Sequence, residues 1–435
     1  MALKRPKGTF DLLPPGSPGL DKHNRMDRHQ LLLEQTRETL ERAGAKYIQT
    51  PLFEALELVE RGVGETTDVV QKEMYSVSAR GSDEGFVLRP ESTASIVRAY
   101  LENGLKQFPA PLKLWTYGPM FRAEQPQAGR YRQFHQVDYE VLGSDDPLTD
   151  AEAIALMWQV LERTGLKNLE LKLSSLGDPV DREAYNLYLR DLFHPHLERL
   201  SLLSISRLER NPLRVLDSKE AQDIALIAEL GPRSLLESLG TDARAHLERV
   251  CAYLDVWGVP YRLDPSIVRG LDYYRRTAWE VHHAGVGAKA ALGGGGRYDG
   301  LAELLGGPHT PGVGWALGVE RLLIALEAEK VPAPAVAGPL LYLGALEDTL
   351  LPQVTTLALE VRRTASCEFG YRVKKPGKHL EDAVKKGAVF LGLIGPDEAS
   401  AGTISLKNLE RGEQLTLPRA ELNGYLQSHI STENR

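Results

Sequence analysis

Residues 115–143, WTYGPMFRAEQPQAGRYRQFHQVDYEVLG, constrain the fold of this chain more than any other stretch. The pattern predicts two strands, residues 115–122 and 132–142, joined by a long polar loop rich in arginine. In the second strand, side chains alternate between two faces with period two. One face carries Phe134, Gln136, Asp138 and Glu140, and the other carries His135, Val137, Tyr139 and Val141. The second set is typical of a core face.

The first set is unusual because an amide and two carboxylates stand where most strands would pack aliphatic side chains. Taken alone, the strip fits a half-solvated antiparallel strand with a polar face. The loop favours a binding site, because it holds Arg122, Glu124, Arg130 and Arg132 beside the strand ends. Guanidinium groups in such a position are suited to bidentate binding of phosphate or carboxylate.

The composition indicates a soluble globular protein of several domains. A chain of 435 residues is too long for one core, and it is 42% hydrophobic and 26% charged. The net charge of −7 argues against unspecific coating of nucleic acid but allows a local basic surface. The two cysteines, Cys251 and Cys367, form no disulfide framework or zinc motif, which fits a reducing cytoplasm. We expect no secretion signal and no membrane span.

The first third of the chain predicts a helix, an extended segment and a strand-to-helix corner. The helix runs from about Asp21 to Gly44, which stands where a C-terminal cap belongs. Residues 86–94, FVLRPESTA, predict a short strand and then a helix capped by Ser92 or Thr93. Glu91 at this corner has two interpretations: an acid complementing the helix dipole, or a carboxylate that holds a substrate ammonium group.

Residues 166–260 are rich in leucine, arginine and glutamate and predict a mostly helical insertion without a catalytic cluster. Three further stretches follow: IVRGLDYY at 267–274, ALGGGGRYDGL at 291–301 and GVGWALGVERLL at 312–323. The first fits a strand with a bulge. The glycine run, which is neither a Walker loop nor a Rossmann loop, allows close backbone approach or positive φ. Arg321 opens a helix and can face an anion there.

Residues 332–339, PAPAVAGP, predict a linker. After the linker, strands at 340–345 and 389–394 alternate with helices at 351–364 and 379–386, which predicts an α/β unit. The basic run at 372–379 is most simply a solvated face, and an RNA-binding surface is the alternative.

These motifs resemble those of class II aminoacyl-tRNA synthetases, and specifically histidyl-tRNA synthetases. FRAE at 121–124, GRYRQFHQ at 129–136 and Glu140 resemble motif 2. The helix, strand and Pro51 resemble motif 1, and GVGWALGVER resembles motif 3. RPKGTFDLLP at 5–14, RPESTA, RGLDYY at 269–274 and GGRYDGL are similar to histidyl-specific signatures. The resemblance covers essentially the whole chain.

The resemblance implies an α+β fold: an antiparallel-sheet catalytic domain with a helical insertion, plus a C-terminal α/β anticodon-binding domain. The implied boundaries are 1–165 and 261–330 for the catalytic core, 166–260 for the insertion, 331–339 for the linker and 340–435 for the terminal domain. The implied reaction converts ATP and L-histidine to histidyl-adenylate and then charges tRNA(His). A cytoplasmic homodimer is implied, with Mg²⁺ accompanying ATP and no metal site built by the protein alone.

The resemblance also implies roles for individual residues. Arg122 and Arg269 would be catalytic, flanking the α-phosphate. ATP binding would involve Arg122, Glu124, Arg269 and Arg321. Histidine binding would involve Glu91, Ser92, Thr93, Arg122, Gln136, Glu140, Arg269, Tyr273 and Tyr274, with Glu140 and Tyr274 at the imidazole.

Some positions depart from the family pattern. Ser92 replaces a usual glycine, and Ala123 and Gln125 replace usual histidine or tyrosine and arginine in motif 2. The terminal domain lacks a clean GRSLKKQ run. Two other functions are consistent with parts of the sequence: a noncatalytic, synthetase-like regulatory subunit of ATP phosphoribosyltransferase, and an RNA-binding module without catalysis. The retained arginines, RGLDYY and the terminal domain disfavour both.

Overall fold

The computed structural model describes residues 3–21, 24–64, 67, 69–78, 85–216, 218–267, 273–286, 291–334 and 338–433. The chain divides into two compact units, Met1–Pro334 and Ala335–Arg435. The fold is α+β, with a mixed but largely antiparallel sheet in the first unit and an α/β arrangement in the second. In the described part of the chain, no helix is long and apolar enough to cross a membrane.

An eight-stranded sheet forms the centre of the first unit. Its strands, in sheet order, are β1 (Lys46–Tyr47), β5 (Leu112–Phe121), β6 (Gln133–Leu142), β11 (Gly312–Gly318), β10 (Ala291–Arg297), β9 (Arg275–His283), β7 (Leu169–Ser175) and β8 (Arg262–Leu263). Only the outer pairs β1–β5 and β7–β8 are parallel. The hairpin predicted from residues 115–143 is confirmed as β5 and β6, which pair from Leu112–Leu142 to Phe121–Gln133.

One face of this sheet packs against four helices and forms the largest core. The helices are α1 (Met26–Arg42), α4 (Pro147–Arg163), α8 (Thr241–Trp257) and α10 (Val319–Ala328). Val137, Tyr139 and Val141 belong to this core, as their alternation predicted. Asp146 caps α4 by accepting from the Leu148 N–H at 2.9 Å, and Gly44 follows the end of α1 with φ +84°. The helices leave the opposite face of β6 for the site.

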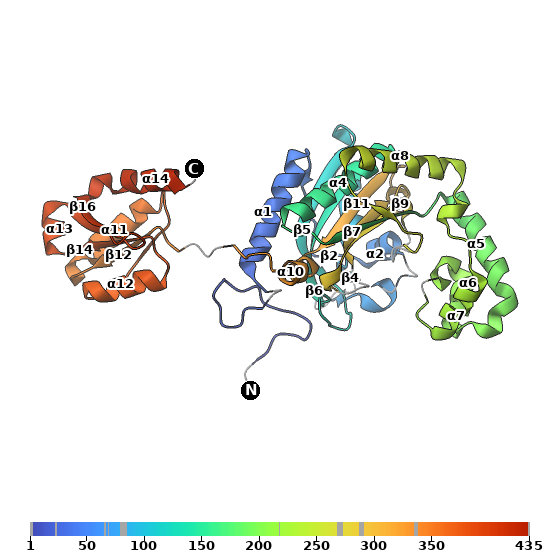
Figure 1. Ribbon diagram of the computed structural model, residues 1–435, viewed down its shortest axis with the longest axis horizontal. Coiled ribbons are helices and arrows are strands. Elements are labelled where there is room, and N and C mark those ends of the chain that lie inside the picture. The colour runs from blue at the N-terminus through green and yellow to red at the C-terminus, as the bar shows by residue number, and fades with distance from the viewer. Residues whose placement is uncertain are drawn as a thin grey trace. The chain divides into compact units, whose positions relative to one another are not determined.

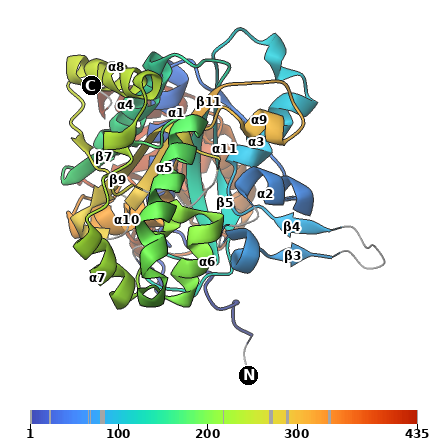
Figure 2. The same cartoon turned by 90° about the vertical axis from the view of Figure 1, so that its right-hand side faces the viewer.

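The opposite face is partly covered by a small sheet and short helices. These are β2 (Phe53–Ala55), β4 (Phe86–Leu88), β3 (Ser76–Val77), α2 (Leu56–Val63), η1 (Val69–Glu73), α3 (Thr93–Glu102), η2 (Leu105–Gln107) and α9 (Leu301–Leu304). The short helix η6 (Ala284–Val286) lies on the first face, against α10 and the main core. Figure 2 shows β3 and β4 side by side next to α2. Helix α3 packs through Ile96, Val97 and Tyr100 into a second core. That core also contains Tyr273 and Tyr274, so it adjoins the site.

The segment expected to be a helical insertion differs from expectation at its beginning and end. Residues 169–175 form β7, which pairs with β9 in the central sheet, and α8 packs against α4 in the main core. Between them lie α5 (Pro179–Phe193), η3 (His194–Arg199), α6 (Leu202–Arg210), η4 (Pro212–Val215), α7 (Ala221–Leu230) and η5 (Leu236–Ser238). These helices lie together in Figure 1 and share a separate core that includes Tyr185, Leu189 and Phe193. Leucine stripes predict helices but do not reveal which core receives them.

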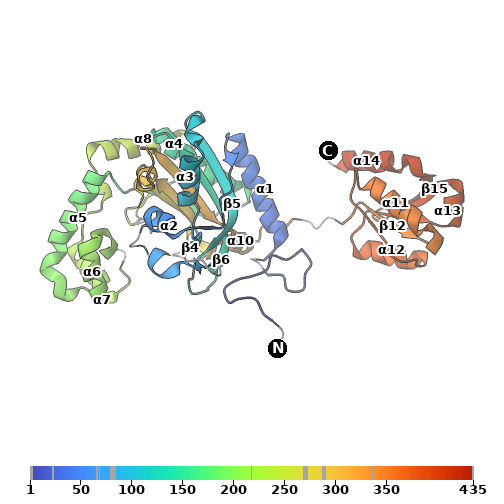
Figure 3. The same ribbon diagram turned by 180° about the vertical axis from the view of Figure 1, so that it is seen from behind.

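The second unit is a five-stranded sheet with helices on both faces, and it is the α/β unit that the alternating pattern predicted, with more strands than that pattern indicated. Its elements are β12 (Leu341–Ala345), η7 (Asp348–Leu350), α11 (Leu351–Val361), β13 (Cys367–Phe369), α12 (Pro376–Lys385), β14 (Phe390–Ile394), α13 (Pro396–Ala401), β15 (Thr403–Asn408), β16 (Gln414–Pro418), η8 (Arg419–Glu421) and α14 (Leu422–Glu433). The strand order is β13-β12-β14-β15-β16. Figure 3 shows α12 and α14 on opposite sides of this sheet.

Candidate active site

The polar face of β6 opens into a cavity of about 280 Å³. Phe134, Gln136 and Asp138 line this cavity, as expected for alternate residues of one strand. The other walls come from β9, β10, β11, the start of α10 and the loop between β5 and β6. The Oε1 atom of Gln136 is buried and has no hydrogen-bond donor among the described residues. A buried amide oxygen of this kind indicates that a ligand donor completes the site.

Arginines from two distant segments face the same cavity. Arg122 directly follows β5; its Nε donates to the Pro90 carbonyl at 3.0 Å, and its guanidinium lies 5.4 Å from the Phe134 ring centre. Arg321, in the first turn of α10, donates to the carbonyl oxygens of Gly129 and Ala291 at 3.2 and 2.8 Å. The sequence prediction that Arg122 and Arg321 share one site is therefore consistent with the geometry.

The electrostatics of this wall favour an anion. Burial lowers the pKa of Arg321, and the positive charges of Arg130 and Arg122 lower it further. Arg130 donates to Glu124 Oε2 at 3.0 Å, so the Glu124 carboxylate partly neutralises the positive charge of the three arginines. Several guanidinium groups around one cavity repel one another, and a bound polyanion removes that cost. Arg130 lay in the expected loop, although the sequence assigned no ligand to it.

The strand-to-helix corner at Glu91 differs in detail from the prediction. Glu91 itself caps α3: Oε2 accepts from the Thr93 N–H at 2.8 Å and Oε1 accepts from the Ala94 N–H at 2.9 Å. Ser92 stands at the predicted N-cap position, but its side chain makes no capping hydrogen bond, and the Glu91 carboxylate accepts from the backbone N–H groups instead. Glu91 also lines the cavity, and burial raises the pKa of its carboxyl despite these hydrogen bonds. Both interpretations of Glu91 are therefore physically compatible.

Glu140 does not line the cavity, although it shares a strand face with residues that do. Its side chain is fully buried, and it accepts a hydrogen bond from Thr93 Oγ1 at 2.6 Å and another from the Tyr298 hydroxyl. Burial raises the pKa of Glu140 well above its ordinary value. Thr93 does line the cavity, so Glu140 lies directly behind it. Tyr298 was part of the GGRYDGL signature but received no role from the sequence.

Asp138 and Ser92 form the deep part of the same region. Asp138 lines the cavity, and Ser92 is fully buried and not part of the cavity wall. Burial and the neighbouring Glu91 carboxylate raise the pKa of Asp138 to about 8, against the opposing effects of the Ser92 hydroxyl, Arg89 and Arg122. The sequence placed Asp138 on the correct face but assigned no role to it. The signal that could have assigned a role to Asp138 was its position between Gln136 and Glu140 on the polar face of β6.

Two tyrosines close another side of the cavity. Tyr273 and Tyr274 both line it, with ring centres 4.6 Å apart. Tyr273 also contacts Tyr298 edge-on at 5.8 Å, which connects the pair to Glu140. Arg269, expected to be catalytic, lies outside the described residues.

The glycine run is a strand rather than a loop. Gly293, Gly295 and Gly296 lie in β10 without positive φ. A Cβ on Gly293 would stand 2.1 Å from the Ala316 carbonyl oxygen, and one on Gly296 would stand 2.6 Å from the Tyr274 ring. The glycines therefore serve close approach rather than positive φ. They let β10 lie against the neighbouring strand β11 and against the ring of Tyr274.

Comparison with known proteins is consistent along the whole chain. Residues 22–322 match the family model described as histidyl-tRNA synthetase, and residues 341–429 match that of the anticodon binding domain. The histidine–tRNA ligase of Deinococcus radiodurans is 62% identical over 422 residues, covering 97% of this chain and 99% of the relative. That of Thermus thermophilus is 52% identical over 426 residues, covering 98% and 99%. The crystal structure of apo S. aureus histidyl-tRNA synthetase has a TM-score of 0.82 at 33% identity, covering 98% and 100%.

Proposed function

Because the chain belongs to the histidyl-tRNA synthetase family, we propose that the cavity against β6 is where histidine and ATP react. The chain is a histidine–tRNA ligase of class II: it activates L-histidine with ATP and transfers the histidyl group to the 3′ end of its tRNA. The alternative, a regulatory subunit of ATP phosphoribosyltransferase, is not favoured, because the ligases match over nearly their full length and the C-terminal unit is present.

One observation carries the proposal for the chemical step: Arg122 and Arg321 face the cavity that also contains Gln136. In adenylate formation the histidine carboxylate attacks the α-phosphorus, so two anions must approach each other in line. Fixed cations lower the cost of that approach, and arginine keeps its charge under burial. Arg122 would hold the carboxylate and the α-phosphate, and Arg321 the outer phosphates. Arg269 would lie on the other side of the α-phosphate, and this role rests on its place in the RGLDYY motif.

The amino and carboxylate ends of histidine would bind at Glu91, Thr93 and Gln136, which line the cavity, whereas Ser92, predicted with them, is buried behind its wall. Gln136 Oε1 can accept from the ligand ammonium group, since no described residue donates to it. The Glu91 oxygens each accept one backbone N–H and retain a second lone pair for the same ammonium group. Asp138, next to them on the cavity wall, adds a carboxylate that ligand binding can ionise.

The imidazole would lie against Tyr273 and Tyr274, with Glu140 behind Thr93. Glu140 accepts hydrogen bonds from Thr93 and Tyr298 and does not line the cavity, so an imidazole N–H would reach its remaining lone pairs only if the Thr93 side chain turned aside; with Thr93 in place, Glu140 would act through the Thr93 hydroxyl. A site that hydrogen-bonds a ring nitrogen discriminates strongly, because a ligand without that group leaves buried polar atoms unpaired. Ser92, which replaces a glycine, is accommodated inside the protein rather than in the cavity.

Mg²⁺ would enter with the nucleotide. Among the described residues, no three His, Cys, Asp or Glu side chains form a metal-binding group. Mg²⁺ in nucleotide sites takes phosphate oxygens and only one or two carboxylates, which fits the presence of Glu124 and Glu280 on the cavity wall. When bound, Mg²⁺ supplies positive charge to the phosphate oxygens.

The C-terminal unit would bind the anticodon of tRNA(His). Tyr371 is 82% exposed and directly precedes the basic run at 372–379. Exposed aromatic rings beside lysine and arginine suit stacking and phosphate contact with single-stranded bases. Residues 340–435 would then be the anticodon-binding domain, 331–339 its linker, and 1–165 and 261–330 the catalytic core. Of the predicted insertion 166–260, the helices from α5 to η5 would lie near the acceptor stem, while β7 and α8 belong to the core.

We also propose a homodimer formed at the motif 1 edge of the sheet. β1 is a two-residue edge strand, and Tyr47, Leu52, Phe53 and Phe108 near it are each more than 40% exposed. Exposed apolar side chains at a sheet edge are typical of a protein interface. Molar mass by light scattering at several concentrations tests the dimer.

The protein would work in the cytoplasm. Both cysteines are free, in keeping with that location.

Histidine-dependent exchange of pyrophosphate into ATP tests the function. We expect exchange in the wild type, and about a hundredfold slower exchange in Arg321→Ala because one cation of the transition state is lost. Histidine affinity by calorimetry should be unchanged in that variant, since Arg321 would contact only the nucleotide. Folded wild-type protein without exchange would exclude the assignment, and equal loss of histidine affinity would exclude the role of Arg321.

A further inference from the structure

Helix α5 of the insertion holds the chain at the point where it leaves the histidine site and enters β9. Arg182 Nη1 donates to the Tyr274 carbonyl oxygen at 3.0 Å. Arg276 donates from Nε to Asp178 Oδ1 at 2.7 Å and from Nη2 to Asp178 Oδ2 at 3.1 Å, a bidentate pair. Asp178 and Arg182 are four residues apart at the start of α5, so they lie on one side of the helix. One helical turn therefore holds both Tyr274 and Arg276.

The backbone at Arg276 is strained. Of the described residues other than glycine, only Arg276 and Lys330 have positive φ, and that of Arg276 is +46°. The pairing of β9 with β10 shifts register between Gly296 and Arg297, which marks a β-bulge here. The Arg276 N–H donates to the Gly177 carbonyl at 3.0 Å, and its carbonyl accepts from the Leu176 N–H at 2.6 Å. Such strain persists only where the surroundings determine it, and bulges near active sites redirect side chains.

The catalytic core fixes Arg276 from the other side. Arg276 Nη1 lies 3.3 Å from His246 Nδ1, and His246 Nε2 lies 3.3 Å from Asp150 Oδ1. Because arginine only donates, Nδ1 must be the acceptor and the Nε2–H must donate to Asp150. Asp150 is itself paired with the fully buried Arg297 of β10. Arg276 thus connects α5 with the centre of the sheet.

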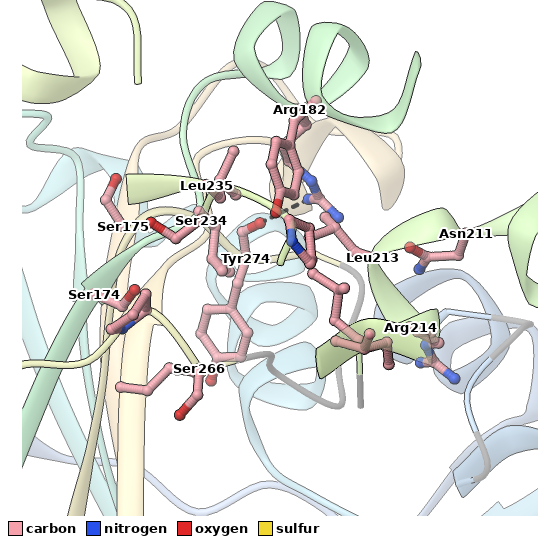
Figure 4. Close-up of a pocket in the computed structure, with 17 residues that line it drawn as sticks. Ser174, Ser175, Arg182, Asn211, Leu213, Arg214, Ser234, Leu235, Ser266 and Tyr274 are labelled. Atoms are coloured by element: carbon pink, nitrogen blue, oxygen red, sulfur yellow. Dashed lines mark hydrogen bonds between the residues drawn. The ribbon is translucent and has the colours of Figure 1, made fainter. Parts of the chain in front are cut away.

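Tyr274 is held both by packing in the second core and by the hydrogen bond at its carbonyl oxygen. A second cavity of about 410 Å³ lies between the insertion helices and the sheet, and Tyr274 lines both this cavity and the one at β6. Figure 4 shows Tyr274 and Arg182 on the wall of the second cavity, with their hydrogen bond dashed. Backbone hydrogen bonds at Tyr274 and Arg276 therefore add to the packing of the Tyr274 ring against Tyr273.

We propose that Arg276 is a positioning residue for the histidine site: its bonds to Asp178 and His246 hold the strained bulge that directs Tyr273 and Tyr274 toward the imidazole pocket. The inference rests on the proposed histidine-binding role of the two tyrosines. It also ties the amino-acid pocket to the position of α5, because Asp178 begins that helix. A purely structural Arg276 would affect stability and leave substrate preference unchanged.

The test compares Arg276→Ala, Arg276→Gly and Arg276→Lys in pyrophosphate exchange, with thermal unfolding measured alongside. We expect the KM for histidine to rise about tenfold in the Ala and Gly variants while the KM for ATP changes by no more than about twofold. Gly should be more stable than Ala, because glycine adopts positive φ without cost, yet be no better at binding histidine. Lys keeps the charge without the bidentate geometry and should recover part of the affinity.

Arg199→Ala is the matched control, since it removes an exposed arginine–glutamate pair of the insertion far along the chain from β9. It should leave both KM values unchanged. Asp178→Asn should reproduce the histidine defect, and the double variant with Arg276→Ala should be less than additive. Equal changes in both KM values, a stability loss alone, or additive effects would overturn the proposal.

Tyr274→Ala separates this inference from the function beneath it. If Tyr274→Ala raises the KM for histidine and Arg276→Ala does not, the positioning role is wrong and the histidine site stands. If Tyr274→Ala itself has no effect on histidine, the assigned role of the tyrosines is wrong, and the positioning role falls with it.

Discussion

The buried pair Arg297–Asp150 offers a sharp prediction about stability. Both side chains are fully buried, and every N–H of Arg297 has an acceptor. Nε donates to both oxygens of Asp150 at 3.1 Å. Nη1 donates to the Ser144 carbonyl oxygen and to Asp299 Oδ1, each at 2.9 Å. Nη2 donates to Thr149 Oγ1 at 3.1 Å and also to Asp150 Oδ2. This network joins β10 to α4. Arg297→Met keeps the volume and removes the charge.

The expected cost follows from the charge left behind. Removing one partner of a buried ion pair costs about 3–5 kcal/mol, because the other partner stays buried without compensation. For a unit of about 330 residues, an unfolding entropy of roughly 0.7 kcal/mol/K converts about 4 kcal/mol into a Tm decrease of about 6 °C. Arg297→Met with Asp150→Asn removes that lone charge as well, so the double variant should regain part of the loss.

The pH dependence of the unfolding free energy gives an independent test. In the wild type, burial raises the pKa of Asp150, but Arg297 and the hydrogen bonds from His246 and Arg297 outweigh it and leave the pKa below 3.8. That lowered pKa contributes stability at pH above 3.8, which is lost as pH falls below it. In Arg297→Met only burial and His246 remain, so we expect the pKa to rise and the unfolding free energy to increase from pH 7 to pH 5 relative to wild type.

Scanning calorimetry of wild type, both single variants and the double variant, at pH 5 and pH 7, measures all of these quantities. A Tm decrease under about 2 °C in Arg297→Met, or the same pH trend as wild type, would refute the reasoning. Either result would mean that water or a rearranged group compensates Asp150.

Three further predictions concern the site. Thr93→Val removes the donor to Glu140 Oε1, so the Kd for histidine should rise about tenfold with little change for ATP; calorimetry with each substrate decides. Asp138, with its pKa near 8, is protonated in the free protein at neutral pH, so histidine affinity should increase as pH rises through 8, and Asp138→Asn should remove that trend in titrations from pH 6.5 to 9. A Cβ on Gly314 would stand 1.7 Å from Glu140 Oε2, so Gly314→Ala should lower the Tm strongly or prevent folding, whereas Gly377→Ala, with open space around it, should be neutral or slightly stabilising.

Much of the fold could be predicted because its signals are local. Alternation along residues 132–142 placed the β5–β6 hairpin and its core face, and the pattern after residue 340 placed β12, α11, α12 and β14 of the second unit but not β13, β15 or β16. The same alternation could not show that residues 169–175 join the central sheet, because β7 pairs with β9, more than a hundred residues away. Periodicity indicates which face is buried, and pairing partners are decided by the folded chain.

The site shows the same division. By itself the sequence determined which side chains share the polar face of β6 and which arginines stand beside it, since strand period and loop position depend only on neighbours along the chain. Only the tertiary structure decided that Glu140 takes hydrogen bonds from Thr93 and Tyr298, which are 47 and 158 residues away. Such bonds are made where packing brings donors to a buried carboxylate, and no local pattern records that meeting.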